Sequence, residues 1–113
     1  PKLKKGTGNE LVTVNNWTAC YNSGDGAIAL SCTVTAADGS PSITGVGLIL
    51  NTSDGTTLAS FYVDASGGSE TVNPALNLPA GNLKVGQTVE GVVSGECEGH
   101  HYFSEEKLTI TAC

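Results

Sequence analysis

Turn signals divide this chain at intervals of about ten residues, and this spacing is the feature that most limits how it can fold. Residues 23–26 (Ser-Gly-Asp-Gly), 38–41 (Asp-Gly-Ser-Pro) and 53–55 (Ser-Asp-Gly) are three of these signals. The runs between them are rich in Val, Ile, Leu and Thr and are too short for amphipathic helices, so they are typical of strands. Arg and Met, two strong helix formers, are absent. The spacing therefore predicts an all-β chain.

The expected strands follow one another along nearly the whole chain. We expect them at residues 11–21, 27–35, 43–50, 58–63, 70–72, 88–94 and 107–112. Between them, residues 66–69 are interpreted as a break, 74–86 as an irregular crossover and 99–101 as a turn. Seven or eight short strands in residues 10–113 predict a single antiparallel β-sandwich.

Two of these segments carry a clear local pattern. Alternation in residues 27–35 places Ile28, Leu30, Cys32 and Val34 on one face of a strand. Residues 43–50 and 58–63 flank Asp-Gly, a dipeptide that tolerates the positive φ of a tight turn, so we expect them to form a hairpin.

The few basic residues are placed very unevenly. Lys2, Lys4 and Lys5 give residues 1–9 a charge of +3, whereas residues 10–113 hold two lysines against eleven acidic residues, a formal −9. This division predicts a basic N-terminal arm (1–9) ahead of an acidic domain (10–113). We expect Lys2, Leu3, Lys4 and Lys5 to bind a partner, because an extended arm of nine residues reaches about 30 Å. The alternative is a solvated leader.

Composition narrows the classes of partner. The chain of 113 residues has a pI of about 4.6, and an acidic domain disfavours nucleic-acid binding, which needs a basic face. No run approaches the roughly 20 apolar residues of a membrane helix, so we expect no membrane partner. No apolar leader opens the sequence, and Pro1 fits an intact cytosolic product after removal of Met; a processing site is the alternative.

Four cysteines, Cys20, Cys32, Cys97 and Cys113, allow three fully paired connectivities. None forms a C-x-x-C motif, so zinc-ribbon and redox motifs are not expected. A hairpin around residues 24–26 would set Cys20 beside Cys32 across neighbouring strands. Four reduced, buried thiols are the other alternative that the residues leave open.

The only cluster with metal-ligand chemistry is residues 96–101 (Glu-Cys-Glu-Gly-His-His). Adjacent strand residues point to opposite faces, so we interpret this cluster as a polar hairpin tip and expect no metal. Asp25, Asp38, Asp54 and Asp64 lie in or beside turns, where Asp usually bonds its own backbone.

No constellation of residues predicts catalysis. Residues 91–95 (Gly-Val-Val-Ser-Gly) are one residue out of register for the G-x-S-x-G nucleophile motif and lie in a predicted strand. No other nucleophile has a base at motif spacing. We therefore expect neither enzyme activity, catalytic residues nor a cofactor.

The stretch 78–89 (Leu-Pro-Ala-Gly-Asn-Leu-Lys-Val-Gly-Gln-Thr-Val), together with the Asp54-Gly55 hairpin, resembles an immunoglobulin or fibronectin type III module. The resemblance implies an inter-sheet bridge between Cys32 and Cys97, which would leave Cys20 to meet Cys113 where the first and last strands adjoin. Two departures stand out: Trp17 precedes Cys32 instead of following it, and Gly95 stands where the family has its corner Tyr.

In size and layout the chain also resembles the small decoration (cement) proteins of tailed-phage capsids. That resemblance implies a non-enzymatic structural module made in the host cytoplasm and located on the virion surface. Its partner would be a protein assembly, the major capsid protein, reached through the arm, with homo-oligomers on the assembly. The alternative is a secreted or cell-surface adhesion module cut from a longer protein, with two disulfides and glycans at Asn16 and Asn51, which begin N-x-[ST] sequons.

Overall fold

The structure is a computed structural model that describes residues 11–37 and 43–113, except for the side chains of 65–67. All of the regular structure in these residues is β. The nine strands are β1 (Val12–Asn22), β2 (Ala27–Ala36), β3 (Ile43–Thr52), β4 (Thr57–Ser69), β5 (Thr71–Val72), β6 (Ala75–Pro79), β7 (Thr88–Cys97), β8 (His100–Thr109) and β9 (Thr111–Ala112). The described part of the chain contains no helix long and apolar enough to span a membrane.

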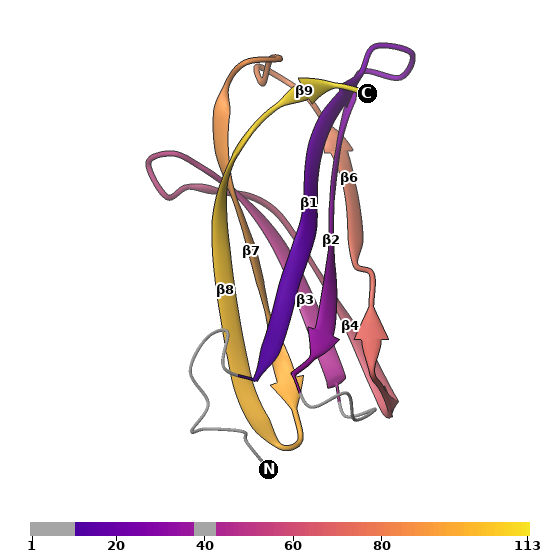
Figure 1. Cartoon of the computed structure of the whole chain (residues 1–113). Helices are drawn as coiled ribbons and strands as arrows, with labels where there is room; N and C mark the ends of the chain where they lie inside the picture. Colours follow the sequence, from indigo (N-terminus) through magenta and orange to yellow (C-terminus); the bar gives the residue numbers. More distant parts are fainter. Residues whose placement is uncertain (1–10, 38–42) are drawn as a thin grey trace.

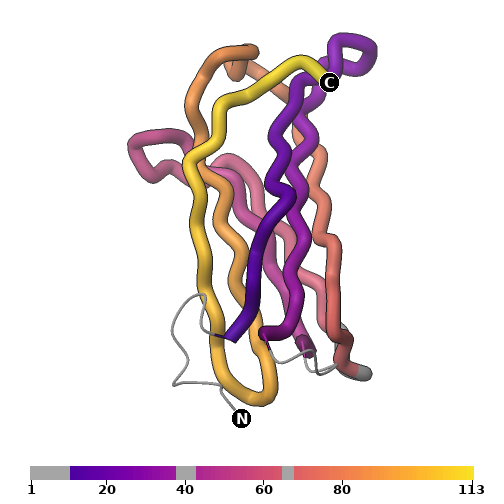
Figure 2. The backbone as a smooth tube through the Cα atoms, viewed as in Figure 1, coloured from indigo at the N-terminus to yellow at the C-terminus, as the bar shows by residue number. Residues whose placement is uncertain are grey.

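The strands form two sheets packed face to face (Figure 1). One sheet has the order β5-β2-β1-β9, with β6 also paired to β2, and the other has the order β4-β3-β7-β8. All pairs are antiparallel except β1 with β9, where Cys20 lies opposite Thr111. The backbone trace shows the chain leaving β8 and crossing to the other sheet to reach β1 (Figure 2). The expected immunoglobulin-like β-sandwich is confirmed.

The core lies between the two sheets and follows the period of two along each strand. In β2 the side chains of Ile28, Leu30, Cys32 and Val34 are all buried, as the alternation predicted. From the opposite sheet, Val46, Leu48 and Leu50 of β3 meet them. Each fully buried aliphatic side chain stabilises the fold by about 1.5–3 kcal/mol, so this alternation is what fixes which face of each strand is buried.

Three segments differ from the sequence prediction. The expected break at 66–69 lies within β4, because an edge strand tolerates glycine where no second neighbour packs on it. Part of the expected crossover is β6, whose Leu76 and Leu78 pair opposite Leu30 and Ile28. At the C-terminal end, His100 and His101 begin β8, and the strand expected at 107–112 is divided between the end of β8 and β9.

The turn before β8 is made by Glu98 and Gly99, both at positive φ. That leaves the histidines in register with β7, with His101 opposite Glu96. The assignment of residues 99–101 to a turn was therefore wrong by two residues, since the left-handed pair at 98–99 completes the reversal on its own.

A bulge in β1 places the only tryptophan against the core. The pairing of β1 with β2 shifts register between Asn15 and Thr18, and Asn16 adopts a φ of 56°. Trp17 packs against the core from this bulge. The space for its ring comes from Gly91 of β7, where an added Cβ would lie 2.5 Å from the ring. A bulge that re-aims one side chain thus brings a partly buried Trp against the core from an unusual position in the chain.

A buried tyrosine joins three strands of the second sheet. Tyr102 of β8 is fully buried, and its hydroxyl donates a hydrogen bond to the carbonyl of Gly45 in β3 at 3.0 Å. It reaches across Gly95 of β7, which lies opposite Tyr102 in the ladder. Burial raises the pKa of Tyr102 above its usual value. Gly95, which stands at the position of the family's corner Tyr, leaves room for this contact.

Candidate binding surface

The solvent-facing side of the β4-β3-β7-β8 sheet carries a short apolar stripe among polar and charged residues. Residues of β3 alternate, so the side chains of Val46, Leu48 and Leu50 enter the core and Ile49 points outward with Gly45 and Gly47. Val92 lies opposite Ile49 on β7 and is only 5% exposed although it is not part of the core cluster. The outer face of an antiparallel sheet is ordinarily polar, so an apolar stripe here indicates a contact surface.

Four residues on this face share one register row across all four strands. Tyr62 of β4 lies opposite Gly47 of β3, Gly47 opposite Ser94 of β7, and Ser94 opposite Phe103 of β8. We call these four residues the aromatic row. Its ends are well exposed, 62% for Tyr62 and 43% for Phe103. Three strand spacings, about 14 Å, separate Tyr62 from Phe103. The two aromatic side chains therefore lie on either side of the small residues Gly47 and Ser94.

The tyrosine of the row lies along the sheet over two glycines. A Cβ built on Gly45 would meet the Tyr62 hydroxyl oxygen, and one built on Gly47 would lie 3.3 Å from its ring. An aromatic side chain that covers strand glycines compensates for the packing they lack. Because more than half of Tyr62 stays exposed, the ring also retains a face for a partner.

The small residues make a shallow depression in the surface. Its volume is about 290 Å³, and it is lined by Gly47, Ile49, Ser60, Phe61, Tyr62 and Ser94. Two serine hydroxyls are thereby set among apolar and aromatic side chains. Such a mixture can bury an apolar side chain of a partner and orient it with one or two hydrogen bonds.

An acidic margin borders the aromatic row on the same face. Glu105 lies opposite Val92, and Glu90 lies opposite Lys107. Glu90, through a side-chain hydrogen bond and its like charge, raises the pKa of the Glu105 carboxyl. Two acidic groups held close together favour a partner that brings a cation to them.

A second, larger hollow of about 430 Å³ lies at one end of the sandwich. Leu58, which follows the β3–β4 turn, lines it together with Leu78 of β6 and with Leu83 and Gln87 of the segment between β6 and β7. Leu78 and Leu83 also belong to or pack on the core. We interpret this hollow as the open end of the core, because its apolar walls are the same side chains that close the sandwich.

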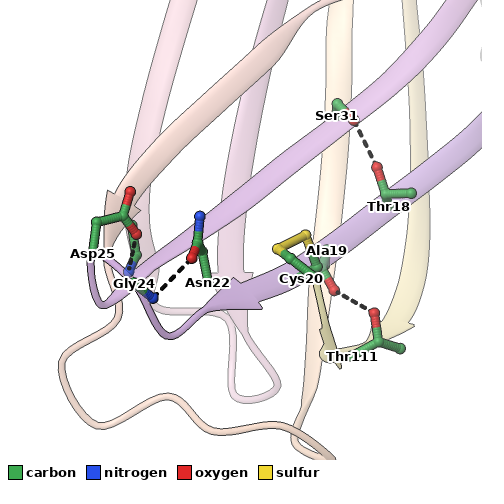
Figure 3. Close-up of a disulfide and its surroundings, with 10 residues drawn as sticks. Thr18, Ala19, Cys20, Asn22, Gly24, Asp25, Ser31 and Thr111 are labelled. Carbon is green, nitrogen blue, oxygen red and sulfur yellow. Dashed lines mark hydrogen bonds between the residues drawn. A yellow bond between two sulfur atoms is a disulfide. The ribbon is translucent and has the colours of Figure 1, made fainter.

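The disulfide joins the first and last strands. Cys20 is bonded to Cys113, closing a separation of 93 residues, and the parallel pairing of β1 with β9 brings the two together (Figure 3). The bond from the Thr111 hydroxyl to the Ala19 carbonyl, 3.5 Å, lies beside it. The alternative in which Cys20 pairs with Cys32 is therefore wrong: the β1–β2 register sets Cys20 opposite Ala29.

The other two cysteines lie inside the sandwich. Cys32 is a buried, free thiol, and its burial raises its pKa to about 12. The inter-sheet bridge between Cys32 and Cys97 that the immunoglobulin resemblance implied is therefore not formed in this structure. Cys97 is buried, and its thiol donates to the Leu11 carbonyl at 3.8 Å, which joins the end of β7 to the beginning of β1.

The residues weighed as metal ligands are kept apart by the geometry. Glu96, Glu98, His100 and His101 are exposed, whereas Cys97 points into the core. No group of three or more His, Cys, Asp or Glu side chains in the described ranges could hold a metal ion.

The aspartates of the turns serve the backbone. Asp54 accepts from the Thr52 hydroxyl and from the Thr56 amide, and these bonds lower the pKa of its carboxyl. Asp25 accepts from the Ala27 amide at 3.2 Å. Asp38 lies outside the described residues.

The sequence predicted partner-binding residues at the N-terminus and not on this sheet face. Lys2, Leu3, Lys4 and Lys5 lie outside the described residues, as does the whole expected arm. Tyr62 and Phe103 were missed, because an aromatic residue in a strand does not by itself reveal its cross-strand neighbours. The signal that could have found the site is the pair Gly45 and Gly47, whose shared face needs a covering side chain.

Comparison with known proteins gives a likeness of fold alone. No known protein family matches the sequence, and no curated protein sequence matches it. Among solved structures, a β-glucuronidase from Parabacteroides merdae is similar over 88% of this chain, with a TM-score of 0.63 and 10% identity. A DUF3823 family protein from Bacteroides ovatus is similar over 91% (TM-score 0.57, 13% identity), and OgpA from Akkermansia muciniphila over 96% (TM-score 0.55, 12% identity).

The chain spans only part of each of these proteins: 14% of the β-glucuronidase, 56% of the DUF3823 protein and 29% of OgpA. The shared unit is thus one β-rich domain within a longer chain. Together, the fold and these likenesses define an immunoglobulin-like β-sandwich domain.

Proposed function

We propose that this chain is a non-enzymatic binding module that attaches to the surface of a larger protein assembly. The observation that carries the proposal is the aromatic row, with exposed Tyr62 and Phe103 at its ends and the depression beside Gly47 between them. Aromatic side chains with an apolar body dominate the energetics of protein contacts. The acidic margin selects a partner whose own apolar patch is bordered by lysines or arginines.

In its more specific form, the proposal makes the chain a decoration protein of a virus capsid, with the major capsid protein as partner. What supports this form is the division of charge between residues 1–9, at +3, and the acidic remainder. Residue 11, where the described chain begins, lies at the far end of β1 from the disulfide to Cys113. A basic arm and an acidic sandwich then contact the assembly separately, the arm by charge and the sheet face by its aromatic side chains.

The experiment compares binding of the full chain and of two variants to the assembly with which it co-purifies. Removal of residues 1–9 should weaken binding and make it less sensitive to salt, since each exposed Lys–carboxylate pair contributes only about 0.2–1 kcal/mol and is screened. Tyr62→Ser with Phe103→Ser should weaken binding with the salt dependence unchanged. Val85→Ser is the matched control, because Val85 is 53% exposed but lies in the β6–β7 connection.

Thermal unfolding of each variant shows that a loss of binding does not arise from misfolding. Binding by the truncated chain as tight as by the full chain would refute docking through the arm. Binding by the Tyr62 and Phe103 double variant as tight as by Val85→Ser would refute the role of the sheet face. If the assembly is a capsid, shells carrying the protein should survive heating better than bare shells, by mass action.

A second candidate function is favoured by the disulfide. A Cys20–Cys113 bond persists in an oxidising compartment, which fits a secreted or cell-surface adhesion module cut from a longer protein. The sequon residue Asn16 is exposed on the β1 bulge, where its amide donates to the Thr33 hydroxyl. Mass spectrometry of the natural product distinguishes the two candidates: glycan at Asn16 supports secretion, and a bare chain on a particle supports decoration.

A further inference from the structure

The two edges of the four-stranded sheet differ sharply in charge. Along the β8 edge, five of ten residues have acidic or basic side chains: His100, His101, Glu105, Glu106 and Lys107. Along the β4 edge, residues 57–63 read Thr-Leu-Ala-Ser-Phe-Tyr-Val, with neither a charge nor a proline. Charged residues and prolines on an edge strand are what prevent it from pairing with another chain. One edge of this sheet is protected in that way and the other is not.

The β4 edge is also long and open. β4 has β3 as its only neighbour in the sheet. In the part of the chain that the structure describes, no backbone hydrogen bond outside the strand ladders involves residues 57–64. Four of the six large apolar side chains that are exposed in this part lie on it: Leu58, Phe61, Tyr62 and Val63. Unpaired amides and carbonyls beside exposed apolar side chains form a template for one more strand.

We propose that β4 is a self-association edge, at which a second copy of this chain pairs its own β4 antiparallel to the first. The occupant is a second copy because the edge is neutral on an otherwise acidic molecule of formal charge −6. A cationic partner finds no carboxylate along residues 57–63. The same edge of a second copy, in contrast, can approach this edge without charge repulsion. The contact is isologous about a two-fold axis perpendicular to the sheet.

The residues of β4 are complementary to themselves in such a pairing. Residues that lie opposite each other in a sheet point to the same face. In a two-fold symmetric pair, one residue of β4 must therefore lie opposite its own copy. Centred on Phe61, it sets Tyr62 opposite Ser60 of the second copy and Val63 opposite Ala59. Asp64 then meets the uncharged Leu58 and not its own copy, so no like charges oppose each other across the contact.

The pairing has a consequence for the proposed binding surface, although it does not depend on that surface. Two sheets of four strands become one continuous sheet of eight, and both aromatic rows lie on the same side of it. The dimer therefore presents two equivalent rows to a repetitive partner, which raises the overall binding strength without any new contact to each site.

The test uses the full chain alone, so its result is independent of any assembly. Sedimentation from low micromolar to millimolar concentration should show a reversible monomer–dimer equilibrium for the natural chain. Val63→Lys places a charge on the edge twice per dimer and should raise the dissociation constant at least about tenfold. Val85→Lys is the matched control: it makes the same change at an exposed valine off the edge and should leave the equilibrium unchanged.

Hydrogen exchange locates the contact. Amides of residues 59–64 should gain protection as the natural chain is concentrated, and amides of β8 should not. If Val63→Lys fails to fold, Ser60→Lys replaces it, since Ser60 points outward at the same edge and contributes nothing to the core. A chain that stays monomeric over the whole range, or a dimer that Val85→Lys weakens as much as Val63→Lys, would overturn the proposal.

Discussion

Replacing Gly95 by alanine tests the contact that joins three strands of the second sheet. A Cβ at this position would lie 1.9 Å from the carbonyl oxygen of Gly45 and 2.7 Å from the hydroxyl of Tyr102. The first of these atoms is backbone in the centre of the sheet, and the second belongs to a fully buried side chain. Neither can move aside without a shift of β3 or loss of the Tyr102–Gly45 hydrogen bond.

The loss of stability expected for Gly95→Ala follows from these two contacts. Overpacking of a closely packed core costs about 1–3 kcal/mol. A buried hydroxyl and carbonyl that lose their bond add about 1–3 kcal/mol. We therefore expect Gly95→Ala to lower the free energy of unfolding by about 4 kcal/mol, and the melting temperature of a domain of this size by about 16 °C.

Gly45→Ala is the matched control. Its added Cβ is also too close to another atom, but that atom is the hydroxyl end of Tyr62, a side chain that is 62% exposed. Neither glycine has a positive φ, so the backbone tolerates alanine at both positions. The ring of Tyr62 can swing into solvent, so Gly45→Ala should cost less than about 1 kcal/mol.

Urea unfolding followed by circular dichroism measures Gly95→Ala, Gly45→Ala, Tyr102→Phe and the double variant Gly95→Ala with Tyr102→Phe. Because the two residues share one hydrogen-bonded contact, the double variant should lose less stability than the two single losses added together. The reasoning is refuted if Gly95→Ala is no less stable than Gly45→Ala, since the backbone would then have relaxed at little cost.

Three other predictions follow from the disulfide, the tryptophan bulge and the buried thiol. Cys20→Ser removes the bond to Cys113, and the free energy of unfolding should fall by about 2–5 kcal/mol because the bond closes a long loop. Reduction of the natural chain should give the same loss. An unchanged unfolding midpoint would show that the bond is not formed. Gly91→Ala places a methyl group against the ring of Trp17 and should lower the free energy of unfolding by about 1–3 kcal/mol. It should also shift tryptophan fluorescence to the red, and an unshifted spectrum would contradict this prediction. Burial raises the pKa of Cys32 from 9.0 to about 12, so above pH 9 the unfolded chain loses a proton that the folded chain keeps. Stability should therefore fall as pH rises from 9 towards 12, and Cys32→Ala should lessen that fall by up to about 1.4 kcal/mol per pH unit; equal slopes for the two proteins would refute the assignment.

The sequence alone was enough to predict the class of fold and most of the strands. Turn residues recur at short intervals, and the alternation at Ile28, Leu30, Cys32 and Val34 assigns one face of β2 to the core. These signals are local: a turn depends on the φ that its own residues allow, and alternation depends on the geometry of one strand. The Asp54-Gly55 hairpin was predictable for the same reason.

Only the tertiary structure decided which distant residues meet. The aromatic row needs the register of three separate strand pairs, and a shift of one residue in any of them would turn Tyr62 or Phe103 to the other face. Cys113 meets Cys20 only because the chain crosses from β8 to form β9 beside β1. Trp17 reaches the core only because β1 bulges at Asn16 and β7 has a glycine below it. Each of these results depends on contacts between residues that are far apart along the chain. Such contacts form only when all the strands pack together and bury the core, so no single segment of the sequence encodes them.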